Sequence, residues 1–403
     1  MRIEDTDKKR EVEGSKEKIQ ELLKLFGLAW DEFYVQSERV RTGVYQEAAQ
    51  KLMAEGHAFY CQCEAKNAKE SFSKELRDPC RDLKLTSGAV KLKVPENQNV
   101  NFHDFVLDRD ISWNTSDVSD ATLLKSDGFP TYHLAVVVDD TAMDISHVLR
   151  GHDWMPSTPI HLLVYKYLGY EIPQIGHLTD IQDPEGGKLS KRKGSTSCEG
   201  LLAEGYLPEA ILNFIMLLGW APKDNQEIFS LEKFVENFDP KGFQKTNPVF
   251  NREKLDWFNG YYLRQIEDGE LINYLVKFAP EGADLNLIER IAPLVKDRMK
   301  KLSDFQSLAG FFFERPKPLK VTENYSNHLK KALAALESVT PWTKEELDNA
   351  LMAVVEKEKF KTGDFFMDLR GTITGSKFTP PINDSIVILG KDETLGRLKE
   401  ALG

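Results

Sequence analysis

Cysteine is scarce in this chain: only four occur among 403 residues, at positions 61, 63, 80 and 198. So few cysteines in so long a chain cannot supply the disulfide framework typical of small secreted domains. Long hydrophobic runs are also missing. None approaches the roughly 18 residues that span a bilayer, and the opening MRIEDTDKKR has no apolar signal core. We therefore expect a cytoplasmic protein that does not cross a membrane.

An excess of basic charge is missing as well. The formal net charge is -11, which excludes a protein that binds polyanions over its whole surface. Against this background the segment GGKLSKRKGSTS (186–197) carries Lys188, Lys191, Arg192 and Lys193 between glycines and hydroxyl residues. Such a loop can contact phosphate oxygens, although charge density alone is equally typical of a solvated surface loop. It lacks the spacing of a nucleotide-binding P-loop.

The periodicity of apolar residues divides the chain into parts. Helical spacing occurs in SKEKIQELLKLFGL (15–28) and VYQEAAQKLMAEG (44–56). Between Glu64 and Ser126 helices are rare, and alternating polarity predicts strands at 90–94 and 105–113. The apolar YHLAVVVDD (132–140) predicts a strand buried on both faces, and TPIHLLVYKYLG (158–169) predicts a helix.

The order of these elements predicts the fold class. Strands that alternate with helices indicate a doubly wound parallel sheet, and the rare-helix stretch is an insertion in it. The segment 208–220 predicts a buried helix that begins at a proline, and helical patterns continue from about Arg264 to the end. The proline-broken RPKPLK (315–320) is the best candidate for a linker.

Several motifs together resemble one family. KLSKRKG resembles the KMSKS signature of class I aminoacyl-tRNA synthetases. Taken in order, the following segments resemble bacterial glutamyl-tRNA synthetases from Arg2 to the end of the chain: RIEDTD, GHAFYCQC, GFPTYHLAVVVDD, VLRGHDW, STPIHLLVYKYLG, KLSKRKG, EAILNFIMLLGW and SKFTPPI.

The resemblance implies a multidomain α/β and all-α protein. It implies a Rossmann-like catalytic domain (1–47 and 133–200) whose doubly wound parallel sheet is incomplete. It further implies an inserted α+β acceptor-binding domain (48–132), a stem-contact region (201–264) and a helical anticodon-binding domain (265–403).

The resemblance also implies the reaction and its residues. ATP, with Mg²⁺ on its phosphates, activates L-glutamate, which is then joined to the 3′ end of tRNA(Glu); the family's usual form is a monomer. Glu4, Tyr132 and Arg150 match substrate-binding positions, and His133 and Trp154 flank them. Taken alone, Glu4 is more typical of a charge in a solvated acidic run, and Arg150 is equally typical of a helix or strand terminus that points at water. Lys188 and Lys191 match the catalytic loop, and Lys188, Ser190, Lys191 and Arg192 match its ATP contacts.

A metal site is implied by three cysteines. Cys61, Cys63 and Cys80 resemble a zinc site that some bacterial members carry in the acceptor-binding insertion. A structural zinc ion needs four ligands, and the family's usual fourth ligand is missing between Glu64 and Pro79. Asp78 or Asp82 can substitute, and a site without metal is the alternative.

The helical half is expected to contact the anticodon. Arg370, in FFMDLRGTITGSKF, matches an anticodon-reading arginine of the family, with an ordinary helix-face arginine as the alternative. Further phosphate contacts are expected from KDRMKK (296–301) and HLKK (328–331).

Two family motifs are missing from the sequence. A histidine pair of the HIGH type and the SPTG-like stretch before it do not occur, and RIEDTD normally follows them. We expect the intact gene product to be an active ligase and this chain alone to be inactive. The alternatives are a non-catalytic tRNA-binding paralogue, an enzyme that glutamylates a modified base (glutamyl-queuosine) in tRNA, and a glutaminyl-tRNA synthetase. The last two fit less well, because a helical half follows Arg264.

Overall fold

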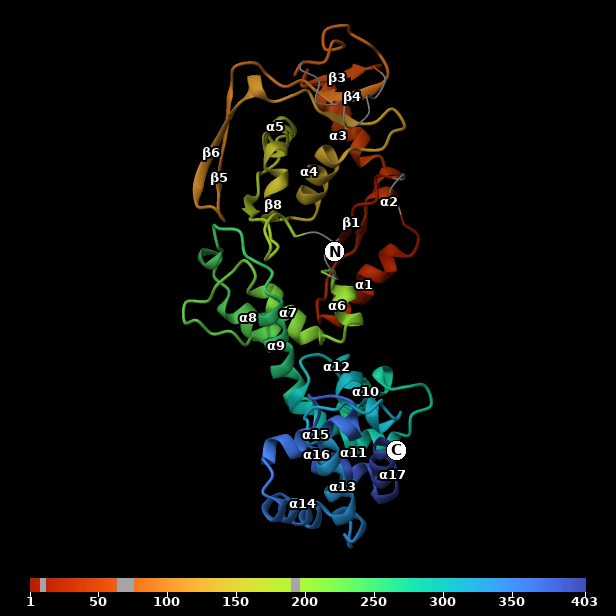
Figure 1. The fold of residues 1–403 in the computed structure, drawn as a ribbon. Helices are drawn as coiled ribbons and strands as arrows, with labels where there is room; N and C mark the ends of the chain where they lie inside the picture. The colour runs from red at the N-terminus through yellow and green to blue at the C-terminus, as the bar shows by residue number, and fades with distance from the viewer. Residues whose placement is uncertain (8–11, 64–75, 190–195) are drawn as a thin grey trace. The chain divides into compact units, whose positions relative to one another are not determined.

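The computed structural model describes residues 1–7, 12–63, 76–189 and 196–403. The chain forms two compact units, Met1–Ser190 with Ile215–Phe250, and Lys191–Phe214 with Asn251–Gly403. The first unit mixes strands and helices, and the described part of the second unit is helical (Figure 1). This combination is the fold class that the sequence predicts.

The first unit contains nine described strands, all of them before residue 180. Most of its helices also lie before residue 180. Its strands are β1 (Arg2–Ile3), β2 (Tyr34–Val35), β3 (Ala58–Cys61), β4 (Ala89–Leu92), β5 (Asn99–Asp104), β6 (Arg109–Asn114), β7 (Thr122–Leu124), β8 (His147–Gly151) and β9 (Gln174–Leu178). Its helices are α1 (Ser15–Leu25), α2 (Gln36–Val40), α3 (Val44–Ala54), α4 (Tyr132–Ala142), α5 (Thr158–Leu168) and α8 (Leu231–Asn237).

Three sheets organise these strands. The largest has the order β6-β5-β9-β8, in which β5 and β8 both run parallel to β9 and β6 pairs antiparallel with β5. A second, antiparallel sheet has the order β3-β4-β7, and β1 pairs parallel with β2. Because the carboxyl ends of β5, β8 and β9 lie at one edge of a sheet, residues at these ends are brought together.

The segment 132–140 is helical, so the strand predicted there is wrong. Helix α4 is buried along seven consecutive residues, Leu134 to Asp140. A continuous apolar run fits a buried helix as well as a buried strand, and here the run packs in the main core of the unit. Figure 1 shows α4 beside α5, with the β5–β6 hairpin on one side and α3 on the other.

The segment 105–113 is not one strand either. The chain turns after Asp104, and β6 begins only at Arg109. Asp108 in this turn has a φ of 53°, in the left-handed region that aspartate tolerates better than most residues. The strand predicted at 90–94 corresponds to β4 and is confirmed.

The second unit is built from helices, and the last five of them, α13 to α17, surround an apolar core of their own. They are α6 (Cys198–Ala203), most of α7 (Pro208–Met216), α9 (Arg252–Gln265), α10 (Asp268–Leu275), α11 (Leu285–Val295), α12 (Asp304–Ala309), α13 (Tyr325–Glu337), α14 (Lys344–Glu358), α15 (Thr362–Thr374), α16 (Ile382–Leu389) and α17 (Lys391–Leu402). Helix α7 begins at the predicted proline and ends four residues earlier than predicted.

The segment 315–320 is not a linker. The backbone N–H of Leu319 donates to the carbonyl of Gly371 on α15 at 2.9 Å. A Cβ atom at Gly371 would lie 2.4 Å from the carbonyl oxygen of Leu319, so the segment packs where only glycine fits. Arg315 also pairs with Glu393 and Glu400 of α17, which anchors the start of the segment within the second unit.

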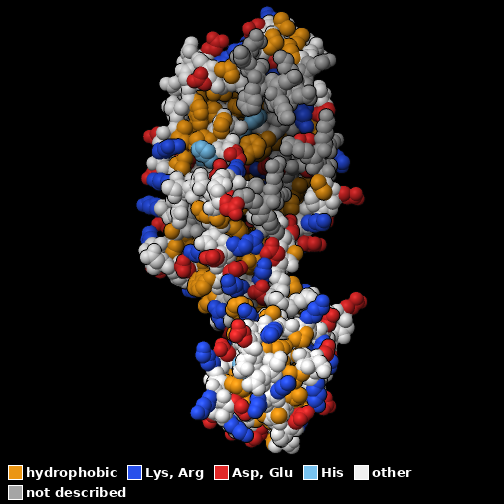
Figure 2. All heavy atoms as spheres, viewed as in Figure 1, with side chains coloured by type: hydrophobic (Ala, Val, Ile, Leu, Met, Phe, Trp, Pro, Cys, Tyr) orange, Lys and Arg blue, Asp and Glu red, His pale blue; other side chains and the backbone are white. Residues whose placement is uncertain are grey.

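The described part of the chain contains no helix long and apolar enough to cross a membrane. On the face of the second unit that Figure 2 shows, Lys and Arg side chains are interspersed with Asp and Glu side chains. A nucleic acid on this face would therefore meet single cations and not a continuous basic patch.

Candidate active site

Arg150 lies near the end of β8, directly opposite His177 of β9 in the parallel register. Its guanidinium donates from Nε to Nε2 of His177 at 3.2 Å and from Nη2 to Oγ1 of Thr158 at 2.6 Å. Its Nη1 contacts Nδ1 of His161 at 2.9 Å. Arg150 is thus held by three side chains, from β9 and α5.

Behind this arginine the hydrogen bonds continue in two directions. Nδ1 of His177 contacts Oδ2 of Asp104, at the end of β5, at 2.7 Å, and both side chains are completely buried. Nε2 of His161 contacts Nδ1 of His133 on α4 at 3.0 Å. Since an arginine only donates, His177 and His161 must each accept from Arg150 through an unprotonated nitrogen and are neutral.

The pKa values of His133 and His161 agree with this arrangement. Burial, together with the nearby Arg150 guanidinium, lowers the pKa of His133 to about 4. The same two causes lower the pKa of His161 well below its ordinary value. Among the described residues no carboxylate forms an ion pair with Arg150, so its charge is not neutralised by direct contact.

Tyr132, the first residue of α4, lies beside this network. Its ring centroid is 4.5 Å from that of Trp154 and 5.5 Å from that of His161. Burial raises the pKa of Tyr132, the Arg150 guanidinium acts to lower it, and Glu4 acts to raise it. Glu4, Arg150 and Trp154, which the sequence singled out together with Tyr132, therefore gather around this tyrosine.

Arg2 organises the acidic side of this site. It donates from Nε and Nη2 to Oε1 of Glu4 at 3.1 Å and 2.8 Å. Its Nη1 pairs with Oδ1 of Asp140 on α4 at 2.5 Å. Burial raises the pKa of Asp140, although Arg2 acts to lower it. Glu4 is thus half-exposed but fixed in direction by an arginine that is itself anchored in α4.

The cationic loop begins in a small hairpin. Gln182 and Lys188 form an antiparallel bridge, and Gly186 and Gly187 between them have φ values of 101° and 82°, which favour glycine. Nζ of Lys188 pairs with Asp153 and, at 3.0 Å, with Asp180. These carboxylates raise the pKa of Lys188. Ser190, Lys191 and Arg192 lie outside the described residues.

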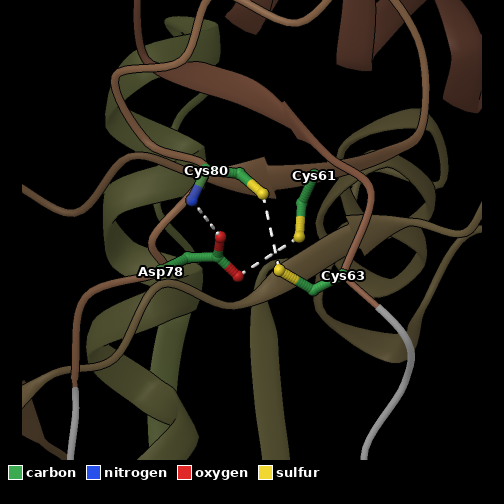
Figure 3. A group of neighbouring side chains, drawn as sticks. All are labelled: Cys61, Cys63, Asp78 and Cys80. Carbon is green, nitrogen blue, oxygen red and sulfur yellow. Dashed lines mark hydrogen bonds between the residues drawn. The ribbon is translucent and has the colours of Figure 1, made fainter.

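The three cysteines gather with one carboxylate. The ligand atoms of Cys61, Cys63, Asp78 and Cys80 all lie within 4.8 Å of one another, and Figure 3 shows their side chains pointing toward one another. Sγ of Cys61 is 3.3 Å from Oδ2 of Asp78, and the Sγ atoms of Cys63 and Cys80 are 3.4 Å apart.

Three sulfurs and one oxygen at this spacing fit a tetrahedral zinc ion, whose Zn–S bonds are about 2.3 Å long. Asp78 also pairs with Lys91 and accepts from the backbone N–H of Cys80 at 2.8 Å. Burial raises the pKa of Asp78, but Lys91, Cys80 and Cys61 more than offset this, and the pKa lies below its ordinary value. Asp82 is exposed and pairs with Lys93 at 3.1 Å, so it does not join the group.

The cations expected to contact tRNA differ in their surroundings. In the second unit Lys296, Lys300, Lys301 and Lys331 all pair with carboxylates, and His328 is buried against Asp368. Arg370 on α15 is different: its Nε has no hydrogen-bond partner among the described residues. Burial and the neighbouring Arg298 lower the pKa of Arg370. Arg370 is therefore a half-buried cation beside a second cation.

Several residues of the site were not predicted. Asp104, Arg2, His161 and His177 carry the contacts around Arg150 and Glu4. Arg2 and His161 lie in motifs that the sequence analysis quotes but were not singled out there, and Asp104 and His177 lie outside those motifs. The only local sign of His177 is Gly176, where a Cβ atom would lie 2.6 Å from Cγ2 of Val106. Glycine lets β9 approach the turn after Asp104 this closely.

The chain is similar to known proteins over its whole length. The family model described as tRNA synthetases class I (E and Q), catalytic domain, matches residues 1–257, and the model of an anticodon binding domain matches residues 270–402. A glutamate–tRNA ligase of Dehalococcoides mccartyi is 38% identical, with 100% of this chain and 90% of the relative aligned. One of Borreliella burgdorferi is 35% identical over 100% of this chain and 91% of the relative.

Solved structures give the same result. A glutamate tRNA ligase of Elizabethkingia meningosepticum, in complex with its amino acid, matches with a TM-score of 0.82 at 28% identity. The match covers 100% of this chain and 91% of that one. The glutamate–tRNA synthetase of Elizabethkingia anophelis matches with a TM-score of 0.83 at 29% identity, over 100% and 92%. The chain therefore belongs to the glutamate–tRNA ligase family of class I aminoacyl-tRNA synthetases.

Proposed function

We propose that this protein joins L-glutamate to tRNA(Glu) in two steps, and a charging assay of the chain tests the expectation that it is inactive alone. The α-carboxylate of glutamate attacks the α-phosphorus of ATP, and pyrophosphate leaves. The terminal ribose hydroxyl of the tRNA then attacks the carbonyl carbon of the adenylate, and AMP leaves. Both steps need charge stabilisation and positioning and require no protein nucleophile.

The observation that carries the proposal is the environment of Arg150. Its three described partners, His177, His161 and Thr158, are neutral acceptors, and the rings of Tyr132 and Trp154 lie against each other beside the site. An arginine whose charge is not neutralised favours a carboxylate ligand over an amide, because only the carboxylate supplies the missing negative charge. We assign Arg150 to the side-chain carboxylate of glutamate.

The ammonium group of the substrate needs an acceptor of opposite charge. Glu4 fits this role, since Arg2 fixes the direction of its carboxylate at 2.8 Å. Tyr132 and Trp154, whose ring centroids are 4.5 Å apart, provide an apolar wall for the methylene groups. The four residues together match the charges and the apolar part of glutamate.

ATP is assigned to the cationic loop. Lys188 lies in exposed ion pairs, which contribute little stability, so exchanging its carboxylates for phosphate oxygens costs little. Lys188 and Lys191 stabilise the charge that develops as pyrophosphate leaves, and Ser190 and Arg192 contact the phosphates. Mg²⁺ bound to ATP would neutralise part of the phosphate charge.

Zinc is assigned to Cys61, Cys63, Cys80 and Asp78. The metal would link β3 to the segment after residue 75, and three thiolates with one carboxylate form a closed structural site that leaves no position for a substrate. Its role is thus to stabilise the inserted part of the first unit, here 48–132.

The second unit is assigned to tRNA. Arg370 beside Arg298 presents positive charge that no carboxylate of the described residues cancels, which favours a phosphate or the acceptor atoms of a base. The chain would act as a monomer, in the cytoplasm, where ATP and tRNA are available.

The proposal is tested by amino-acid binding and by charging. In titration calorimetry we expect L-glutamate to bind and L-glutamine to bind at least tenfold more weakly, because the amide lacks the charge. In a charging assay with radioactive glutamate, Lys191→Ala should lower the rate of adenylate formation about a hundredfold. Equal binding of glutamate and glutamine would contradict the assignment of Arg150.

A further inference from the structure

We propose that His177 and Asp104 are positioning residues for Arg150, and that they reserve its positive charge for the side-chain carboxylate of the amino acid. The inference rests on the proposed function, because it assumes that Arg150 receives this carboxylate. His177 touches the arginine, and Asp104 acts only through His177.

The first step of the argument concerns how a buried arginine is held. Carboxylates hold arginine most firmly, but they also cancel its charge. Here Nε and Nη2 donate to an imidazole nitrogen and a hydroxyl oxygen, at 3.2 Å and 2.6 Å. The guanidinium is therefore fixed in orientation by acceptors that carry no charge, and its attraction for an anion is preserved.

The second step concerns the tautomer of His177. Its Nε2 can accept from Arg150 only if the ring proton is on Nδ1. Oδ2 of Asp104 accepts a hydrogen bond from the Nδ1–H of His177, with 2.7 Å between the two atoms, and so favours this tautomer. The imidazole ring lies between the carboxylate and the guanidinium. Asp104 thus controls the acceptor without forming an ion pair with Arg150.

The third step concerns the orientation of Asp104. Its Oδ1 accepts from the backbone N–H groups of Val106, Leu107 and His177, at 3.1, 3.0 and 3.3 Å. These three donors fix which oxygen faces the backbone and which faces His177. Both Asp104 and His177 are completely buried, so neither can turn toward water.

This orientation makes Asp104→Asn informative. The backbone N–H groups would hold the amide oxygen at the place of Oδ1, and the amide NH₂ would face His177. His177 would then carry its proton on Nε2, which can donate to Oγ1 of Thr158, 3.1 Å away, but no longer accepts from the Nε–H of Arg150. We expect the KM for glutamate to rise about tenfold, with the KM for ATP unchanged, in charging assays at saturating tRNA.

Two variants of His177 separate its two nitrogen positions. The amide of His177→Asn reaches only the position of Nδ1, so it keeps the partner of Asp104 and removes the acceptor for Arg150. The amide of His177→Gln reaches the position of Nε2 and can still accept from Arg150. We expect His177→Asn to raise the KM for glutamate about tenfold above that of His177→Gln.

A second buried pair provides the matched control. Nδ1 of His328 contacts Oδ2 of Asp368 at the same distance, 2.7 Å, in the second unit. Asp368→Asn should lower the midpoint of thermal unfolding without changing the KM for glutamate. Thermal unfolding of every variant identifies those that do not fold. If Asp104→Asn does not fold, the comparison of His177→Asn with His177→Gln tests the proposal.

The outcomes separate the inference from the proposed function. If Arg150→Met leaves glutamate binding unchanged in titration calorimetry, the proposed function of this site is wrong. If Arg150→Met weakens binding but Asp104→Asn and His177→Asn leave the KM for glutamate unchanged, as Asp368→Asn should, the proposed function stands. The positioning role is then overturned.

Discussion

Arg150 and His177 are register partners on neighbouring parallel strands, and the Nε–H of the arginine donates to Nε2 of the histidine over 3.2 Å. Strand pairing thus sets the position of the arginine. The third strand, β5, adds Asp104 next to Ile175 of β9. Three segments that are far apart in sequence meet because the carboxyl ends of parallel strands lie at one edge.

His133 should make the stability of the first unit depend on pH. Its pKa is about 4 in the folded chain, below the ordinary value of 6.5. Between these two pH values the unfolded chain binds a proton that the folded chain does not, so stability is lost as pH falls. We expect a loss of about 3 kcal/mol in the free energy of unfolding between pH 6.5 and pH 4, measured by urea denaturation.

The control for this effect is His133→Asn. The side-chain oxygen of asparagine can replace Nδ1 as the acceptor for His161, and it does not titrate. The variant should lose less stability than the wild type between pH 6.5 and pH 4. Other groups also titrate in this range. The quantity to compare is therefore the difference between the wild type and His133→Asn in how the free energy of unfolding changes with pH. Parallel curves would contradict a neutral His133.

Removing Asp78 should remove the metal. In purified protein we expect about one zinc ion per chain by mass spectrometry, and much less in Asp78→Ala, because a carboxylate ligand is lost. Asp82→Ala is the matched control, as Asp82 lies close by but is 82% exposed and, among the described residues, pairs only with Lys93. Equal zinc content in the two variants would show that Asp78 is not a ligand.

Arg2→Met should destabilise the first unit. Asp140 is nearly buried, with 6% of its side chain exposed, and it would lose its cation. Breaking such a pair costs about 3 kcal/mol. The double variant Arg2→Met with Asp140→Asn should recover most of this loss, since the buried charge is then gone. A double variant no more stable than Arg2→Met would contradict the explanation. Thermal unfolding measures both.

The sequence predicts the parts of the fold that depend on local pattern. Helix α5 ends at Leu168, just before Gly169, whose φ of 70° favours glycine, and the sequence predicts this stop. The sequence does not predict helix α4. Its nine-residue apolar run shows no periodic spacing of polar and apolar residues that would distinguish a buried helix from a buried strand. Only the packing of the run against α3 and α5 decides between them.

The candidate site shows the same division. Arg150, Tyr132, Glu4 and Trp154 stand in motifs and could be named from the sequence. Asp104 could not, since it lies 73 residues before its partner His177. Strand register brings the two together, and no local pattern encodes that register. Asp78 was one of two candidates for the fourth ligand, and burial distinguishes it from Asp82.

Arg370→Gln should weaken tRNA binding and leave the second unit as stable as before or slightly more stable. The Nε of Arg370 has no described partner, and Arg298 repels its charge, so the folded state gains little from the arginine. A residue that is costly to the fold but positively charged is suited to an anionic ligand. We expect the KM for tRNA to rise about tenfold, with the KM for glutamate unchanged.

Arg397→Gln is the control. Arg397 is buried and donates to Glu393 and to the carbonyl oxygens of Ile373 and Phe311, so its loss should lower stability instead. If Arg370→Gln unfolds at a lower temperature, as Arg397→Gln should, and binds tRNA normally, Arg370 serves the fold and the proposed contact is wrong.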